Sequence, residues 1–313
     1  MSTPKNSIFT NTPYTTGVDV QLSELLSYKQ HGKMSLNAKR LPATRKLSGN
    51  YLSNIKGRGM EFAEVRHYQA GDDVRSIDWA VTARTGKAHT KLFQEEKERP
   101  VFLLVDLSDS MIFGSQFAFK SVQACHLAAL LSWQTKQRND RLGGIVFNQQ
   151  NVAELKPTSR GKGLMSFLHH NQMLCQKVAF KQTQKQSLLL QLKRLSHLVQ
   201  TGSQIHLISD FSQLDEGCYK LINLLRRHNQ VTVWQITDPL EMQLPKKMLK
   251  ANFKITSLKG SGFLRNKNQQ HSYQTAAHER QQIMQRNLLK YGIAHYEVSA
   301  ANPLLEQLNA YAQ

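Results

Sequence analysis

The chain has few cysteines and no long apolar segment. Its three cysteines, Cys125, Cys175 and Cys218, are far apart and include no Cys-x-x-Cys pair, which excludes a disulfide framework and a thiolate zinc site. The longest apolar runs, such as residues 102–105, are far shorter than the roughly 20 residues that span a bilayer. The N-terminus also lacks the apolar stretch of a secretory signal. We therefore expect a cytoplasmic protein with no membrane span.

Acidic residues are scarce. The sequence has 22 Asp and Glu against 41 Lys and Arg, which gives a net charge of +19. The stretches 25–60, 155–209 and 242–278 contain eight, eight and seven basic residues and no acidic one, whereas ten acidic residues lie between Glu61 and Asp109. This separation predicts basic faces around an acidic patch, and such faces attract phosphate backbones, anionic membranes or acidic proteins.

Nucleic acid therefore remains a candidate partner on charge alone. The basic stretches, however, contain few interleaved aromatic residues and match no RNA-recognition signature, zinc finger or repeat. The sequence also lacks the glycine-rich loops that bind nucleotide phosphates. We expect no specific nucleic-acid binding.

The first part of the chain changes character twice. Residues 1–16 are polar and without periodicity, which predicts a flexible arm. Residues 17–59 combine an N-terminal helix, which we expect Gly32 to end in a left-handed conformation, with a basic linker. Residues 60–99 contain short segments at 61–68, 77–83 and 88–93 that are separated by turns. They predict a small strand-rich subdomain.

Residues 100–313 alternate between strand and helix patterns. The run Val101 to Val105 is continuously apolar, as in a strand that is buried on both faces, and residues 117–136 have helical spacing. We expect further strands at 141–147, 204–208, 231–236 and 294–298, and further helices at 187–200, 218–227, 276–291 and 303–311. This order predicts an α/β fold with a doubly wound, mostly parallel sheet.

Ligand sites in such sheets lie beyond the carboxyl ends of the strands. The first strand ends in Asp106, and Ser108 and Ser110 follow at alternate positions, so three oxygens can point the same way. A later strand ends before Asp210, which an adjacent position would bring to the same edge. Carboxylates and hydroxyls suit Mg²⁺. The alternative is structural, because Asp and Ser after a strand often cap the next helix or form a turn.

These residues carry a family resemblance. Asp106-x-Ser108-x-Ser110 with Asp210 resembles the metal-ion-dependent adhesion site of von Willebrand factor A domains. The preceding run is more specific, with Gly57-Arg58-Gly59-Met60-Glu61-Phe62, then Val65 through Trp79, then Thr82-Ala83-Arg84-Thr85-Gly86. It is similar to the signature of domain-of-unknown-function family 58, whose members have an A-domain-like half. The similarity covers about 250 residues, and this chain resembles the short soluble form.

The resemblance implies a function and a partner. Proteins of this family are usually encoded beside MoxR-type AAA+ ATPases and are thought to mature or remodel other proteins with them. An adhesion-type site would bind Mg²⁺ weakly and accept an acidic residue of a protein partner. The threonine that such sites take from a further loop is missing here, and Ser187 and Thr183 are the candidate substitutes.

The segment Gly71 to Trp79 has two interpretations. Gly-Asp-Asp is good turn chemistry, Arg75 can pair with Asp78, and Trp79 can anchor a core, all of which would be structural. Alternatively, four charged side chains form a partner-docking surface, namely Asp72, Asp73, Arg75 and Asp78.

An enzymatic alternative uses the same region. Asp78 with Glu95 and Lys97 loosely resembles the metal site of restriction-type nucleases, in which two carboxylates hold Mg²⁺ and a lysine polarises the phosphate. The sequence has no Gly-x-Ser-x-Gly elbow and no His-Glu-x-x-His motif. We therefore expect a non-catalytic interaction protein, with a nuclease or nucleic-acid-binding protein as the alternative.

Overall fold

The computed structural model describes residues 12–32, 60–69, 71–95, 98–176, 186–242, 253–257, 260–264 and 267–312. The chain divides into two compact units. The larger unit consists of Met1–Leu41 with Arg99–Gln313, and the smaller unit consists of Pro42–Glu98. The basic linker of residues 33–59 lies outside the described residues.

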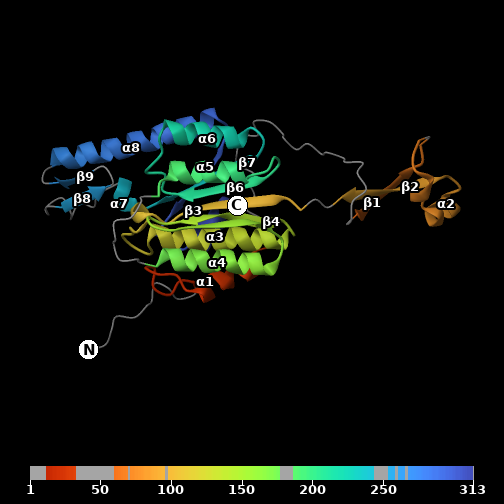
Figure 1. Cartoon of the computed structure of the whole chain (residues 1–313), viewed down its shortest axis with the longest axis horizontal. Coiled ribbons are helices and arrows are strands. Elements are labelled where there is room, and N and C mark those ends of the chain that lie inside the picture. The colour runs from red at the N-terminus through yellow and green to blue at the C-terminus, as the bar shows by residue number, and fades with distance from the viewer. Residues whose placement is uncertain are drawn as a thin grey trace. The chain divides into compact units, whose positions relative to one another are not determined.

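A six-stranded sheet forms the centre of the larger unit, in the order β10-β7-β6-β3-β4-β5 (Figure 1). All neighbours are parallel except β5, which is antiparallel to β4 at one edge. The strands are β3 (Pro100–Asp106), β4 (Arg141–Phe147), β5 (Val152–Thr158), β6 (Gln204–Ser209), β7 (Gln230–Thr237) and β10 (Ala294–Ser299). The predicted fold class is confirmed, and β5 is a strand that sequence analysis missed.

Helices cover both faces of this sheet and enclose two apolar cores (Figure 1). One face carries α1 (Leu22–Ser27), α3 (Lys120–Gln137), α4 (Gly161–Cys175) and α9 (Leu304–Ala312). The other face carries α5 (Leu188–Leu198), α6 (Glu216–Arg226) and α8 (Lys267–Lys290). The remaining elements of this unit are η2 (Tyr28–His31), η4 (Asp109–Met111), α7 (Pro239–Met242) and the hairpin of β8 (Phe253–Ser257) with β9 (Gly260–Leu264). None of the described helices is both long and apolar enough to cross a bilayer.

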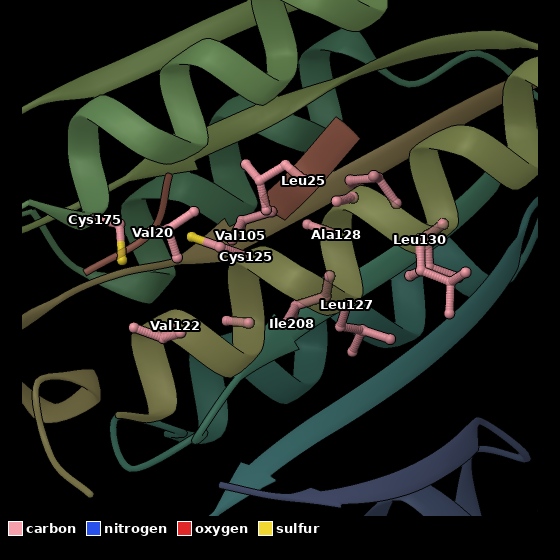
Figure 2. Packing of buried hydrophobic residues seen from close by; sticks show 14 of the residues in the cluster. Val20, Leu25, Val105, Val122, Cys125, Leu127, Ala128, Leu130, Cys175 and Ile208 are labelled. Atoms are coloured by element: carbon pink, nitrogen blue, oxygen red, sulfur yellow. The ribbon is translucent and has the colours of Figure 1, made fainter. Parts of the chain in front are cut away.

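The N-terminal segment is part of the larger unit's core. Val20 and Leu25 are fully buried and lie beside Cys125 and Ala128 of α3 (Figure 2). Tyr14 is also buried and stacks on His126, with ring centroids 3.8 Å apart. The prediction of a flexible arm up to residue 16 is therefore wrong at Tyr14, because the stacking partner on α3 is remote in sequence.

Gly32 does not adopt the predicted left-handed conformation. Its φ of −62° is ordinary for a helix. A Cβ at this position would lie 2.7 Å from the amide nitrogen of Gln137 at the end of α3. Close packing, and not backbone conformation, is what a glycine provides here.

The smaller unit pairs β1 (Met60–His67) with β2 (His89–Glu95) as an antiparallel ribbon. Between them lie η3 (Val74–Ser76) and α2 (Trp79–Thr85). The segment 77–83, which we expected to be extended, is therefore mostly helical. Asp78 caps the first turn of α2, and Gly86 ends the helix with a φ of +70°. Capping by Asp78 and Gly86 therefore favours a helix here more strongly than the short apolar pattern favours a strand.

Burial predicts how truncations of the larger unit affect its stability. Leu25→Ala should lower the free energy of unfolding by about 2–5 kcal/mol, because it leaves a cavity beneath α1. The matched control is Leu289→Ala, at a side chain that is 73% exposed, and should change it by less than about 0.5 kcal/mol. Urea unfolding followed by circular dichroism measures both. Equal effects of the two substitutions would contradict the N-terminal packing.

Candidate cation site at the carboxyl edge of the sheet

Three acidic residues lie at the carboxyl ends of three neighbouring strands. Asp106 ends β3, Asp210 follows β6 and Asp238 follows β7. The parallel register sets Val105 opposite Ile208, so the loops after β3 and β6 leave the sheet together. The prediction that Asp106 and Asp210 share one edge on adjacent strands is confirmed.

Both oxygens of the Asp106 carboxylate are held by neighbouring groups. The backbone N–H of Ser108 donates to Oδ1 at 2.9 Å, and the hydroxyl of Ser209 donates to Oδ2 at 2.6 Å. Asp106 is only 1% exposed. These hydrogen bonds fix the orientation of a carboxylate that would otherwise be free to rotate within the loop.

Hydroxyl groups gather beside this carboxylate. The Ser108 and Ser110 oxygens are 3.4 Å apart, and the Ser212 hydroxyl lies 3.3 Å from Ser110. Ser108 is buried, whereas Ser110 is partly exposed. Hydroxyls from the loops after β3 and β6 therefore meet at one place, with Ser212 exposed to solvent.

The charge of Asp106 is not balanced within the site. Burial, and then the negative charge of Asp210, raise the pKa of Asp106 to about 6, although its hydrogen bonds with Ser108 and Ser209 act in the opposite direction. An ordinary aspartate has a pKa near 3.8. The site thus contains a negative charge that a nearby cation would stabilise.

A cation that sequence analysis missed lies beside Asp210. The ammonium of Lys120, the first residue of α3, donates to Asp210 Oδ2 at 2.8 Å and also to Glu241 of α7. Burial alone would raise the pKa of Asp210, but the charge of Lys120 and the hydrogen bonds from Lys120 and Ser212 together outweigh burial and lower it. One sequence signal was present, because Lys120 is the only Lys, Arg, Asp or Glu between Phe117 and Thr135 in a helix that buries most of its residues.

Asp238 has a structural role at the same edge. Its two oxygens accept the backbone N–H groups of Ser115 and Leu240 at 2.8 and 2.9 Å. It therefore joins the loop before α3 to the start of α7, the short helix that presents Glu241. These contacts help to set the distance between Lys120 and its second carboxylate.

The donors present fit a hard cation on the Asp106 side of the site. One carboxylate and the hydroxyls of Ser108 and Ser110 are oxygen ligands of the kind that Mg²⁺ binds. Within the described residues, no three His, Cys, Asp or Glu side chains are grouped to hold a metal. An ion here would therefore depend on hydroxyls and water, because Asp210 is already paired with Lys120.

The candidate substitutes for the missing loop threonine have different outcomes. The Ser187 hydroxyl accepts the backbone N–H of Leu190 at 3.3 Å and so caps α5. Its role as a metal ligand stays a prediction, and its observed role is structural. Thr183 lies outside the described residues.

The acidic residues of the smaller unit have local partners. Asp72 forms an ion pair with Arg66 at 2.7 Å, and Asp73 accepts the backbone N–H of Arg75. Asp78 accepts the N–H groups of Ala80 and Val81. The predicted pairing of Asp78 with Arg75 is not among these contacts, and Lys91 is the described basic neighbour of Asp78 at 3.6 Å.

This arrangement bears on the nuclease alternative. Asp78 has one oxygen engaged in capping α2 and the other near Lys91, so both take part in local structure. Lys97 lies outside the described residues. The described contacts therefore give Asp78 a structural role, and the nuclease alternative stays a prediction.

Trp79 is not a core anchor. Its side chain is 67% exposed at the start of α2, and Val74 nearby in sequence is 58% exposed. The local contacts of its aspartates agree with the structural interpretation of the Gly71 to Trp79 segment, except for the pairing of Arg75 with Asp78, and Trp79 does not anchor a core. The docking surface stays a prediction.

The unbalanced charge of Asp106 predicts a pH dependence. Its pKa is higher in the folded protein than in the unfolded chain, so ionisation costs stability as pH rises from about 4 to about 6. Asp106→Asn removes this cost, and its stability relative to wild type should improve by up to about 3 kcal/mol between pH 4 and 7. Urea unfolding in a chelator across this range measures the change.

Asp210→Asn is the matched control, because its pKa is shifted in the opposite direction. The paired Asp210 contributes stability above its unfolded pKa and loses it as pH falls. The Asn variant should be less stable than wild type at pH 7, and this deficit should shrink below about pH 4. Parallel pH profiles for the two variants would contradict the assignment of charges at this edge.

Comparison with known proteins assigns the chain to a family. The model of the family described as "Protein of unknown function DUF58" matches residues 64–280, more than half of the chain. Uncharacterized proteins Rv1480 of Mycobacterium tuberculosis and Mb1516 of Mycobacterium bovis are each 30% identical over 202 residues, which is 64% of this chain and 62% of theirs. The match thus spans less than two thirds of these relatives' length.

Solved structures with some similarity include BatB from Bacteroides thetaiotaomicron, with 16% identity over 68% of this chain and 96% of that one, at a TM-score of 0.41. The von Willebrand factor A domain of SpRpn10 shows 11% identity over 68% and 94%, at a TM-score of 0.37. Because these scores are low, the assignment rests on the family match. The chain belongs to the family described as protein of unknown function DUF58.

Proposed function

We propose that this chain is a non-catalytic protein-interaction module that uses the carboxyl edge of its sheet as an adhesion-type site. The observation that carries the proposal is the convergence of two carboxylates from adjacent strands, the buried Asp106 and Asp210, whose side chain is 6% exposed, together with clustered serine hydroxyls. Such a set suits a hard cation that keeps some water ligands. Mg²⁺ is the cation that we propose.

The residues at this site have different roles. Ser108 and Ser209 orient the Asp106 carboxylate through hydrogen bonds. The hydroxyls of Ser108 and Ser110 supply further oxygens, and the partial exposure of Ser110 leaves a path for a partner's side chain. Asp210 contributes charge nearby while it remains bonded to Lys120. The protein thus provides an oriented but incomplete set of ligands.

An incomplete set explains why a partner would contribute. The described carboxylates near this edge include Asp106, Asp210, Asp238 and Glu241, and the Lys120 ammonium pairs with two of these. An acidic partner would be repelled by this local charge. A bound Mg²⁺ would supply the positive charge that accepts a partner carboxylate. Binding of cation and partner would then be coupled, each raising the affinity for the other by the same factor.

The partner that we propose is a MoxR-type AAA+ ATPase, as the family resemblance implies. Catalysis would belong to the ATPase, and this chain would hold or present a client protein. The net charge of +19 would attract an acidic partner at long range and speed association at low salt. The basic faces would then raise the rate of association, and the sheet edge would determine which partner binds.

The serine hydroxyls provide the first test of this proposal. Ser108→Ala combined with Ser110→Ala removes two oxygen ligands while leaving both carboxylates, so Mg²⁺ affinity should fall by about tenfold or more. Affinity for the ATPase should fall with it. The measurement is calorimetric titration of Mg²⁺, and then of nucleotide-free ATPase with Mg²⁺ or with chelator, into wild type and the double variant.

Ser196→Ala is the control for this experiment, because Ser196 lies on α5 and its hydroxyl bonds only the Lys193 carbonyl among the contacts described. It should match wild type in every titration. Equal ATPase affinity for wild type and the double variant, with and without Mg²⁺, would contradict the proposed function. Circular dichroism of each variant checks that the fold is retained.

The exposed face of α2 offers a second contact for the same partner. Trp79 is a large apolar side chain with little packing to lose, and exposed tryptophans are frequent anchors of interfaces. Trp79→Ala should therefore weaken ATPase binding by about tenfold or more while changing the free energy of unfolding by less than about 0.5 kcal/mol.

Val18→Ala, at another exposed apolar residue, is the control and should leave ATPase affinity unchanged. Calorimetry and urea unfolding measure the two quantities. A large loss of stability in Trp79→Ala, or unchanged ATPase affinity, would exclude α2 as a contact.

A further inference from the structure

The Lys120 ammonium is in an unusual position for a lysine. The side chain is 1% exposed, although most lysines keep the charged end in water. Its two described partners, Asp210 and Glu241, come from separate elements, the loop after β6 and helix α7. A buried charge of this kind is retained only with partners that offset its lost hydration.

The partners are sufficient to keep this lysine charged. Burial alone would lower the pKa of Lys120, but the charges of Asp210 and Glu241 outweigh burial and raise it. The ammonium is therefore a permanent cation at neutral pH. It lies against Asp210, one of the two carboxylates that converge at the sheet edge.

We propose that Lys120 is the built-in cation of this edge, and that a divalent ion must compete with it for the charge of Asp210. This inference deepens the proposed function and rests on the same site. While Asp210 is paired with Lys120, the described residues offer a divalent ion Asp106, which has hydrogen bonds but no ion-pair partner among them, and the serine hydroxyls. Binding of the ion is then weak. A partner carboxylate then becomes necessary for tight binding.

Glu241 has a specific part in this competition. It holds the same ammonium as Asp210 and is 34% exposed, so it can keep Lys120 paired when Asp210 turns toward a divalent ion. Lys120 therefore controls the affinity of the site for a divalent ion. It is a positioning residue and not a ligand of that ion.

The test is calorimetric titration of Mg²⁺ alone into the full chain. Lys120→Met keeps the length and apolar stem of the side chain and removes the charge. Mg²⁺ affinity should rise by about 5- to 150-fold, the usual range of coupling between sites. Lys120→Arg keeps the charge and should bind Mg²⁺ as weakly as wild type. Asp210→Asn introduced into the Lys120→Met variant should abolish the gain.

Stability supplies a second readout. Lys120→Met leaves Asp210 and Glu241 without their cation, so this variant should be destabilised and then strongly stabilised by Mg²⁺. The combination of Lys120→Met with Glu241→Gln removes one of the two carboxylates left without a cation and serves where the single variant fails to fold. Millimolar Mg²⁺ should raise the melting temperature of both variants by several degrees more than that of wild type.

The outcomes separate this inference from the proposed function. Unchanged Mg²⁺ affinity in the Lys120→Met variant, or failure of Mg²⁺ to restore folding of either Lys120→Met variant, would overturn the inference. These measurements contain no partner protein. Loss of ATPase coupling in the serine variants tests the proposed function independently, so a gain of Mg²⁺ affinity without any effect on the ATPase would support the inference alone.

Discussion

The parallel pairing of β3 with β6 is the constraint on which the rest of the site depends. It brings the loops that follow the two strands to one edge, where Asp106 is buried and the Asp210 side chain is 6% exposed. Two carboxylates in such a place raise each other's cost of ionisation unless other groups offset it. The surrounding groups offset that cost, because Ser108 and Ser209 donate hydrogen bonds to Asp106 and Lys120 donates to Asp210.

The asymmetry between the two carboxylates is informative. Asp210 has a full positive charge beside it, and Lys120 lowers its pKa. Asp106 has only hydrogen-bond donors, and its pKa is raised. A single lysine thus makes two chemically identical carboxylates different. Asp210 has a partner of opposite charge, and Asp106 does not. Asp106 lies beside the serine hydroxyls, which is where an added cation would reduce the electrostatic cost most.

The elements around the site reach it from distant parts of the chain. Lys120 begins α3, Glu241 lies on α7, and Asp238 joins α7 to the loop before α3 through its bond with Ser115. The N-terminal segment packs on α3 through Tyr14, which stacks on His126. A strongly basic chain thereby brings several acidic groups to one edge, where Asp106 and Asp238 accept backbone N–H groups and Asp210 and Glu241 pair with Lys120.

The sequence by itself determined the fold class and the ends of most strands, because continuous apolar runs between helical patterns have few other solutions. It also determined that Asp106 and Asp210 follow strands of one sheet. Local signals sufficed for these conclusions, since each depends on neighbouring residues. Sequence analysis did not assign Asp78 its role as the cap of α2, because the segment was expected to be extended.

Only the tertiary structure decided which groups touch. The pairing of Lys120 with Asp210 joins residues 90 positions apart, and Tyr14 meets Gln123 across 109 positions. Tryptophan is a residue type that is common in protein cores. Trp79 is nevertheless exposed, because too few residues of the smaller unit pack around α2 to cover it. Burial and charge pairing depend on contacts between remote segments, and spacing along the chain does not record those contacts.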